Sequence, residues 1–151
     1  MTTIREYDFI QSVADAFQFI SFYHPADYIR SLHQAYEREA SPAAKDAIAQ
    51  ILINSRMCAE GHRPICQDTG IAIAFVRVGM DVRWDTRRSL QQLVDEGVRR
   101  AYTDRDNPLR ASVLADPDGK RVNTKDNTPA VVHVELVPGD KVDVVVAAKG
   151  G

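Results

Sequence analysis

The sequence IAIAFVRV, at Ile71–Val78, marks the change from helical to strand-like periodicity along the chain. Its β-branched and aromatic residues predict a largely buried strand. Before it, Gly61 ends a long region in which apolar residues recur at helical spacing. After it, the turn residues that begin at Gly79 redirect the chain. The segment therefore divides a helical part, residues 1–61, from an α+β part, residues 62–151.

Three helices are predicted in the first part. The first ends before His24-Pro25, because a residue that precedes proline is pushed out of the helical region. The second opens at Pro25, and the third opens at Ser41-Pro42, a capping residue followed by a first-turn proline. Their apolar faces are, in chain order, Phe9, Ile10, Val13, Phe17 and Ile20; Tyr28, Ile29, Leu32, Ala35 and Tyr36; and Ala44, Ala47, Ile48, Ile51 and Leu52.

The second part continues with a helix, a loop and two further strands. Ser89 can cap a fourth helix, whose apolar face is Leu90, Leu93, Val94, Val98, Ala101 and Tyr102. Asp104–Asp126 is polar and rich in turn residues, and so long a segment in a compact domain is either a functional or a flexible loop. Ala130–Val137 and Lys141–Ala148 flank the turn residues Pro138-Gly139-Asp140, which predicts a β-hairpin.

The first strand of this hairpin alternates in polarity. Val132, Val134 and Leu136 lie on one side and His133 and Glu135 on the other, which predicts one buried face and leaves His133 as an ordinary sheet histidine. The complete order of elements is that of an α+β fold. It consists of N-terminal helices followed by a strand, a helix and a C-terminal β-hairpin.

Composition excludes several classes of protein. With 44% hydrophobic residues the chain can bury a core, and 19 basic against 21 acidic residues give a net charge of −2. This balance provides no electrostatic footprint for nucleic acid or an anionic membrane. Charges near the N-terminus exclude a signal peptide, and no apolar run approaches the roughly 18 residues of a membrane span. Two cysteines are too few for a secreted disulfide framework, so we expect a cytoplasmic protein.

The segment RPICQDTG, at Arg63–Gly70, concentrates polar and reactive residues between the third helix and the first strand. The Cys66 thiolate is a soft ligand for an iron cluster or zinc, and Gln67 and Asp68 could position a polar substrate beside it. The residues alone leave two plainer interpretations open. Cys66 can be a small buried apolar residue, and Asp68 can initiate a simple turn. Cys58 is interpreted as a structural thiol, because its spacing from Cys66 fits neither zinc nor ferredoxin-like sites.

The end of the sequence, Gly150-Gly151, follows a strong strand directly. Paired glycines after a strand often lie where the backbone approaches a ligand. We therefore expect the natural polypeptide to continue, with a small protein that ends in two flexible glycines as the alternative.

Arg63–Gly70 and the strand that follows it resemble the CQDTG segment of class I fumarases and the related tartrate dehydratases. The similarity continues in family order through further segments. These are NPLRAS at 107–112, NT at 123–124, NTPA at 127–130 and AKGG at 148–151. The set is far more specific than any one motif. Residues 1–151 are accordingly identified as an N-terminal, apparently truncated part of the catalytic domain of this hydro-lyase family.

The resemblance implies an activity and a cofactor. Family members hydrate fumarate reversibly to L-malate, a step of the tricarboxylic acid cycle, and resemble one another in holding an oxygen-sensitive [4Fe–4S] cluster by three cysteines. One iron is left open and acts as a Lewis acid. Cys66 would be the first of the three ligands, and the other two would lie beyond this chain. The resemblance also suggests a homodimer in the full-length protein.

It further implies roles for residues that would contact a small dicarboxylate substrate. Gln67 and Asp68 would face the substrate, with Asp68 near the site of proton transfer. Arg110 would hold a substrate carboxylate through paired charge-assisted hydrogen bonds. Gly150 or Gly151 would begin a glycine loop that approaches the substrate.

Two other functions stay open at this level. The same chemistry could act on tartrate or another small hydroxy-dicarboxylate. The chain could also be a standalone binding module that keeps the fold and has lost the reaction, because only one of its cysteines is placed as a family ligand.

Overall fold

The structure is a computed structural model that describes residues 2–66 and 70–150. The chain forms two compact units. One, the sheet unit, contains residues 2–18 and 70–150, and the other, the helical-hairpin unit, contains residues 19–66. Helices and mixed sheets make this an α+β fold, as the sequence predicts.

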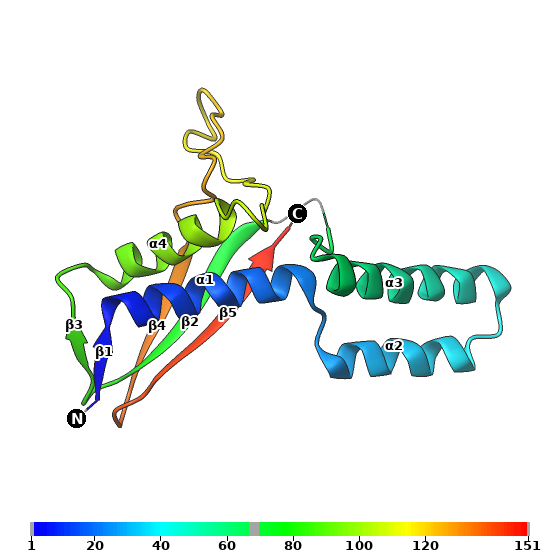
Figure 1. Cartoon of the computed structure of the whole chain (residues 1–151), viewed down its shortest axis with the longest axis horizontal. Coiled ribbons are helices and arrows are strands. Elements are labelled where there is room, and N and C mark those ends of the chain that lie inside the picture. Colours follow the sequence, from blue (N-terminus) through cyan, green and yellow to red (C-terminus); the bar gives the residue numbers. More distant parts are fainter. Residues whose placement is uncertain (1, 67–69, 151) are drawn as a thin grey trace. The chain divides into compact units, whose positions relative to one another are not determined.

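The centre of the sheet unit is a three-stranded sheet of order β4-β2-β5 (Figure 1). β2 (Ile71–Gly79) pairs in parallel with β4 (Val131–Val137) and antiparallel with β5 (Val142–Lys149). β2 and β4 are joined through α4 (Leu90–Tyr102), as a parallel pair requires a crossover connection.

The predicted β-hairpin is wrong in its pairing. β4 and β5 follow one another along the chain, but β2 lies between them. The connection crosses the end of β2 and is held there by three backbone hydrogen bonds: Gly79 N to Lys141 O at 2.8 Å, Met80 N to Val137 O at 2.9 Å and Asp81 N to Gly139 O at 2.9 Å. Placing β2 in the middle satisfies both of its edges, and the local turn pattern does not distinguish the two arrangements.

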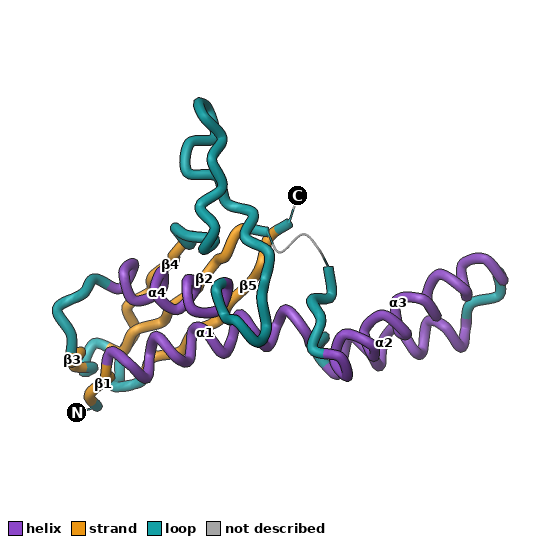
Figure 2. The backbone as a smooth tube through the Cα atoms, turned by 45° about the horizontal axis from the view of Figure 1, so that its top comes forward, coloured by secondary structure: helices purple, strands orange, loops and turns teal. Residues whose placement is uncertain are grey.

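One face of the sheet is covered by α4 and by the first part of α1 (Glu6–Phe22), which lie side by side (Figures 1 and 2). The two helices are close at Gly97, where an added Cβ would be 2.6 Å from a methyl carbon of Val13. Ser89 caps α4 in a capping box with Gln92, as predicted. The core of this unit contains Phe9, Ile10, Val13, Phe17, Ala72, Ala74, Val76, Leu93, Val94 and Val98.

The opposite face of the sheet is more exposed than the sequence predicts. Along β2, buried side chains alternate with side chains that are exposed or half-buried, and Phe75 among the latter is 45% exposed. On the helix-covered face, the predicted burial of β4 is wrong at Val134 and Leu136, which are opposite Val76 and Val78 but are 54% and 69% exposed. β4 is an edge strand. Val134 and Leu136 therefore line, with Trp84, part of an apolar hollow of about 310 Å³ instead of a filled core.

A second, small sheet was not anticipated from the sequence. β1 (Thr3–Arg5) and β3 (Arg83–Asp85) pair in parallel with Ile4 opposite Trp84. The two strands are only three residues long, too short to show a clear alternation of polarity. The Trp84 ring packs edge-on against Phe9, with centroids 5.2 Å apart.

The helical-hairpin unit is built from α2 (Ala26–Arg38) and α3 (Pro42–Gly61). Pro25, predicted as the first helical residue of α2, is its N-cap, so the helix begins one residue later than predicted. Ser41 caps α3 as predicted. The left-handed C-cap of α3 is His62, with φ 46°, and not Gly61. The predicted apolar face of α3 is only partly buried, because Ile51 is 42% exposed. None of the helices in the described part of the chain is long and apolar enough to cross a membrane.

The polar segment between α4 and β4 is a loop that extends from the sheet unit (Figure 2). Its two limbs are held together by backbone hydrogen bonds from Ala115 N to Val122 O at 2.8 Å and from Thr124 N to Val113 O at 2.9 Å. At its tip the Asp116 carboxylate accepts hydrogen bonds from the backbone of Gly119 and Lys120.

Candidate functional site

Cys66 is the last described residue of the helical-hairpin unit, and its thiol is exposed. Gln67, Asp68 and Gly151, to which the sequence assigns substrate contacts, lie outside the described residues. The predicted ligand thiol is therefore accessible, and the remaining described site residues, Arg110 and Gly150, belong to the sheet unit.

The backbone that leads to Cys66 is fixed within its own unit. Ile65 N donates to Ser21 O at 2.9 Å, and the Asn54 side-chain amide donates to Ile65 O at 3.3 Å. Cys58 is 5% exposed, with its Sγ 3.6 Å from Pro64 O. Cys58 is thus the buried structural thiol that its place in α3 predicts, and it braces the turn before Cys66.

Gly70 and Gly150 lie together at one end of the sheet. Ile71, the first residue of β2, pairs with Lys149, the last residue of β5. Gly70 has φ 65°, and a Cβ added there would lie 2.3 Å from the Lys149 carbonyl and 2.5 Å from Gly150 N. Only glycine fits this contact. The last residue of the candidate segment therefore touches the residue that begins the candidate glycine loop.

Asn127 joins the same end of the sheet to the loop. Its side chain is fully buried, and its Nδ2 donates to Gly70 O at 3.0 Å. Its Oδ1 accepts from Ser112 N at 2.7 Å and from Val113 N at 3.2 Å. One side chain therefore connects the start of β2 with the loop limb that follows Arg110.

Arg110 is an exposed residue of that limb. It lies between Leu109, which is 5% exposed, and Ala111, whose carbonyl accepts from Asn123 Nδ2 at 2.8 Å. The backbone of Arg110 is therefore held on both sides, by the buried Leu109 side chain and by the hydrogen bond at Ala111. Its guanidinium is of the type that binds anions.

The base of the loop is anchored on α4. Arg99 Nε is 3.0 Å from the Asp126 carboxylate, which also accepts from Thr128 N at 3.1 Å and from Thr128 Oγ1 at 2.8 Å. Burial alone would raise the pKa of Asp126, but the hydrogen bonds from Thr128 and Arg99 outweigh it and the pKa is lowered. The next anchor is Ala130 N, which donates to Asp95 Oδ1 at 2.8 Å.

The contacts of the Asp126 carboxylate predict that the stability of the fold depends on pH. Because the pKa of Asp126 is lower in the folded state, its stabilisation is complete above an unfolded-state pKa of about 4 and is lost as pH falls through the folded value. In urea unfolding, Asp126→Asn should lower the free energy of unfolding of the complete polypeptide near neutral pH, and by less near pH ~3. Asp118→Asn, at an exposed loop position, is the control. A difference between wild type and Asp126→Asn that stays constant with pH would contradict the assignment.

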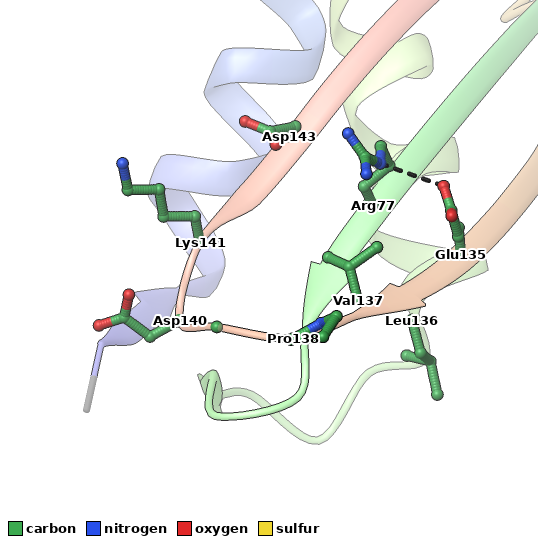
Figure 3. A pocket seen from close by; sticks show the side chains of 9 residues that line it. Arg77, Glu135, Leu136, Val137, Pro138, Asp140, Lys141 and Asp143 are labelled. Carbon is green, nitrogen blue, oxygen red and sulfur yellow. Dashed lines mark hydrogen bonds and ion pairs between the residues drawn. The ribbon is translucent and has the colours of Figure 1, made fainter.

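A polar hollow of about 600 Å³ lies at the other end of the sheet, where β4 leads into β5 (Figure 3). Arg77 and Glu135 form a pair across it, with Nε 3.1 Å from Oε2. Both side chains are more than half exposed, so the pair contributes little to stability. β2 runs from Gly70 to this end, so the hollow is separate from the candidate residues.

The described residues contain no group of three His, Cys, Asp or Glu side chains that could hold a metal by itself. Cys66 fits a cluster as a single ligand, because it is an accessible thiol on a fixed backbone. Cys58 does not fit, because it is buried and its thiol contacts Asn54 and Pro64. In the sequence Asn127 belongs to the NTPA segment of the family resemblance and is assigned no role. An asparagine before Thr-Pro gives no indication that its side chain binds backbone far away in the chain.

Comparison with known proteins gives a consistent result. The family model described as fumarate hydratase (fumerase) matches residues 10–151. The chain is 37% identical over 137 residues to the anaerobic class I fumarate hydratase of Escherichia coli K12, covering 85% of this chain and 24% of the relative. It is 33% identical over 138 residues to fumarate hydratase 2 of Leishmania major, covering 90% of this chain and 24% of the relative.

A third relative is a subunit of a different enzyme. The chain is 32% identical over 143 residues to the L(+)-tartrate dehydratase subunit alpha of Escherichia coli UTI89, covering 92% of this chain and 45% of the relative. The chain thus spans between about a quarter and less than a half of the length of these relatives.

Proposed function

Because the chain belongs to the fumarate hydratase family, whose members are hydro-lyases, we propose that it is the N-terminal part of a class I enzyme that hydrates fumarate reversibly to L-malate. The observation that carries the proposal is the family match over residues 10–151. The contacts of Gly70 with the Lys149-Gly150 backbone and with Asn127 support it, because Asn127 also binds the loop limb that follows Arg110.

In this proposal the substrate is a small dicarboxylate held by side chains of this chain. Arg110 binds one carboxylate, for which a planar guanidinium offers two parallel donors. Gln67 and Asp68 face the substrate, and Asp68 holds the proton that is exchanged with carbon. The backbone of Gly150 and Gly151 approaches the substrate closely, where a side chain would exclude it.

We further propose that Cys66 is one of three cysteines that hold a [4Fe–4S] cluster, with the other two supplied from outside this chain. The exposed thiol is the supporting observation. When bound, such a cluster supplies Lewis acidity to the hydration. In this chain Cys66 contributes the ligand, and the hydrogen bonds at Ile65 and Pro64 orient it.

The role of Arg110 predicts a binding defect. In the complete polypeptide, Arg110→Ala should raise KM for fumarate by roughly 10- to 100-fold, the value of charge-assisted hydrogen bonds to one carboxylate. Arg110→Lys should bring KM only part of the way back to the wild-type value, because an ammonium cannot bind a carboxylate in a bidentate manner. Arg105→Ala, at another exposed arginine of the same loop, should leave KM unchanged. Steady-state kinetics measure all three, and an unchanged KM in Arg110→Ala would remove this residue from the site.

Tartrate dehydration is the second candidate. Its support is the similarity to the tartrate dehydratase subunit alpha, which covers 92% of this chain. A panel of fumarate, L-malate, L-tartrate and related hydroxy-dicarboxylates decides between the two. The fumarase proposal requires fumarate and L-malate to give the highest kcat/KM, and dominant dehydration of tartrate would replace it.

We also propose that the full-length enzyme is a cytoplasmic homodimer, as its family resemblance suggests. Light scattering of the purified complete polypeptide measures the assembly state. A stable monomer that neither binds a cluster nor acts on a dicarboxylate would instead support a non-catalytic binding module.

A further inference from the structure

The Asn127 side chain makes three hydrogen bonds, all to backbone groups. The partners lie 57 residues before it, at Gly70 O, and 15 and 14 residues before it, at Ser112 N and Val113 N. The side chain is fully buried and is the largest buried polar group of the described core. A buried amide that satisfies backbone on two distant segments fixes their relative position, because breaking any bond leaves a buried polar group without a partner.

The chemistry of these partners requires an amide. The two N–H groups are donors and need the Oδ1 acceptor, whereas the Gly70 carbonyl needs the Nδ2 donor, so the amide has one orientation. An aspartate could accept from Ser112 and Val113 but would turn a second acceptor toward Gly70 O. The backbone adds a further requirement, because Asn127 has φ 62°, a left-handed conformation that asparagine tolerates and most residues avoid.

Asn127 is itself held by rigid structure. The preceding residue, Asp126, is paired with Arg99 of α4 at 3.0 Å. After it, Ala130 N donates to Asp95 of the same helix at 2.8 Å. The amide therefore projects from a segment fixed at both ends to α4, which is part of the buried core of the sheet unit.

We infer that Asn127 is a positioning residue that sets Arg110 relative to the Gly70–Gly150 end of the sheet. Ser112 and Val113, whose amides it binds, lie two and three residues after Arg110, and Gly70, which it also binds, touches Gly150. Asn127 acts through the backbone and does not touch substrate. The inference rests on the proposed function for the role of Arg110, whereas the bonds themselves can be tested without any substrate.

The first test measures the bonds directly. Amide hydrogen exchange of the complete polypeptide is compared for wild type, Asn127→Asp and Asn127→Gly, in which glycine keeps the left-handed backbone. In Asn127→Gly the Ser112 and Val113 amides should exchange roughly 10- to 100-fold faster, the cost of losing a buried acceptor. In Asn127→Asp they should stay protected, because the carboxylate still accepts. Wild-type rates in Asn127→Gly would overturn the inference.

The second test asks whether the effect passes through Arg110. Asn127→Asp and Asn127→Gly should each raise KM for fumarate about tenfold or more, with a smaller change in kcat, because a displaced guanidinium weakens substrate binding. In an Arg110→Ala background the same changes should have little further effect on KM, which is the non-additivity expected of coupled residues. Additive effects on KM would mean a merely structural role and would overturn the inference.

The two tests separate this inference from the proposed function. If Arg110→Ala alone leaves KM for fumarate unchanged, the proposed role of Arg110 is wrong, and so is the proposed coupling between Asn127 and Arg110. If Arg110→Ala raises KM but Asn127→Gly changes neither hydrogen exchange nor KM, the proposed function stands and only the inference about Asn127 is overturned. Should Asn127→Gly fail to fold, Asn127→Asp carries the double-mutant comparison alone.

Discussion

Gly70→Ala should destabilise the complete polypeptide by about 3–5 kcal/mol. Alanine disfavours a φ of 65°, and its Cβ would lie 2.3 Å from the backbone carbonyl of Lys149. Neither the central strand β2 nor its partner β5 can move aside, because they pair along their length from Ile71–Lys149 to Val78–Val142. Urea unfolding measures the loss.

Gly139→Ala is the matched control for this prediction. Gly139 also has a positive φ, of 107°, but nothing lies within 4 Å of the Cβ it would gain. Its cost should be conformational strain alone, about 1–3 kcal/mol. A Gly70→Ala variant no less stable than Gly139→Ala would show that the contact between Gly70 and the Lys149-Gly150 backbone is looser than described.

Cys66→Ser should abolish hydration of fumarate by the complete polypeptide. Losing one of three thiolate ligands releases or disrupts the proposed cluster, and with it Lewis-acid stabilisation of several kcal/mol, which corresponds to about 1,000-fold or more in rate. The fold itself should be little affected, because the Cys66 side chain is exposed. Iron and sulfide content after anaerobic purification, together with kcat, measure the two effects separately.

Cys58→Ser provides the control from the same unit. Cys58 is buried and contacts Asn54 and Pro64, so its replacement should cost stability, about 1 kcal/mol, and leave cluster content unchanged. The two cysteines should thus show opposite patterns, with stability lost at one and iron lost at the other. Equal loss of iron in both variants would contradict the division of roles.

The local elements of this fold follow closely from the sequence. Ser41 and Ser89 cap the helices that the sequence predicts them to cap, and the predicted apolar face of α4 is buried except at Leu90, which is half-buried. Both strands after the loop lie within one residue of their predicted bounds. These features depend on residues near one another in the chain, for which capping and periodicity are sufficient guides.

The features that depend on contacts between distant parts of the chain could not be predicted from capping and periodicity. The pairing of β2 with both β4 and β5 requires residues such as Phe75 and Val145 to meet across a long stretch of chain, and the short turn at Gly139 is compatible with either strand order. Exposure of Leu136 follows from its place on an edge strand. The alternation of polar and apolar residues in the sequence is the same whether β4 is a central or an edge strand.

The residues of the candidate site also differ in whether the sequence alone could identify them. Cys66 and Arg110 are named through the resemblance of their segments to a known family, because residue type alone leaves plainer interpretations of both open. Asn127 is not, because its contribution is a set of bonds to the backbone of Gly70, Ser112 and Val113. Residues that position others through the backbone are recognised only once the fold brings their partners together.

Iron content against activity, measured on the complete polypeptide after anaerobic purification and stepwise removal of iron by a chelator, tests the ligand role of Cys66 most directly. We expect the rate of fumarate hydration to fall in proportion to bound iron and to return on anaerobic reconstitution, but not in Cys66→Ser. Full-rate hydration by iron-free protein, or by Cys66→Ser with a complete cluster, would contradict it.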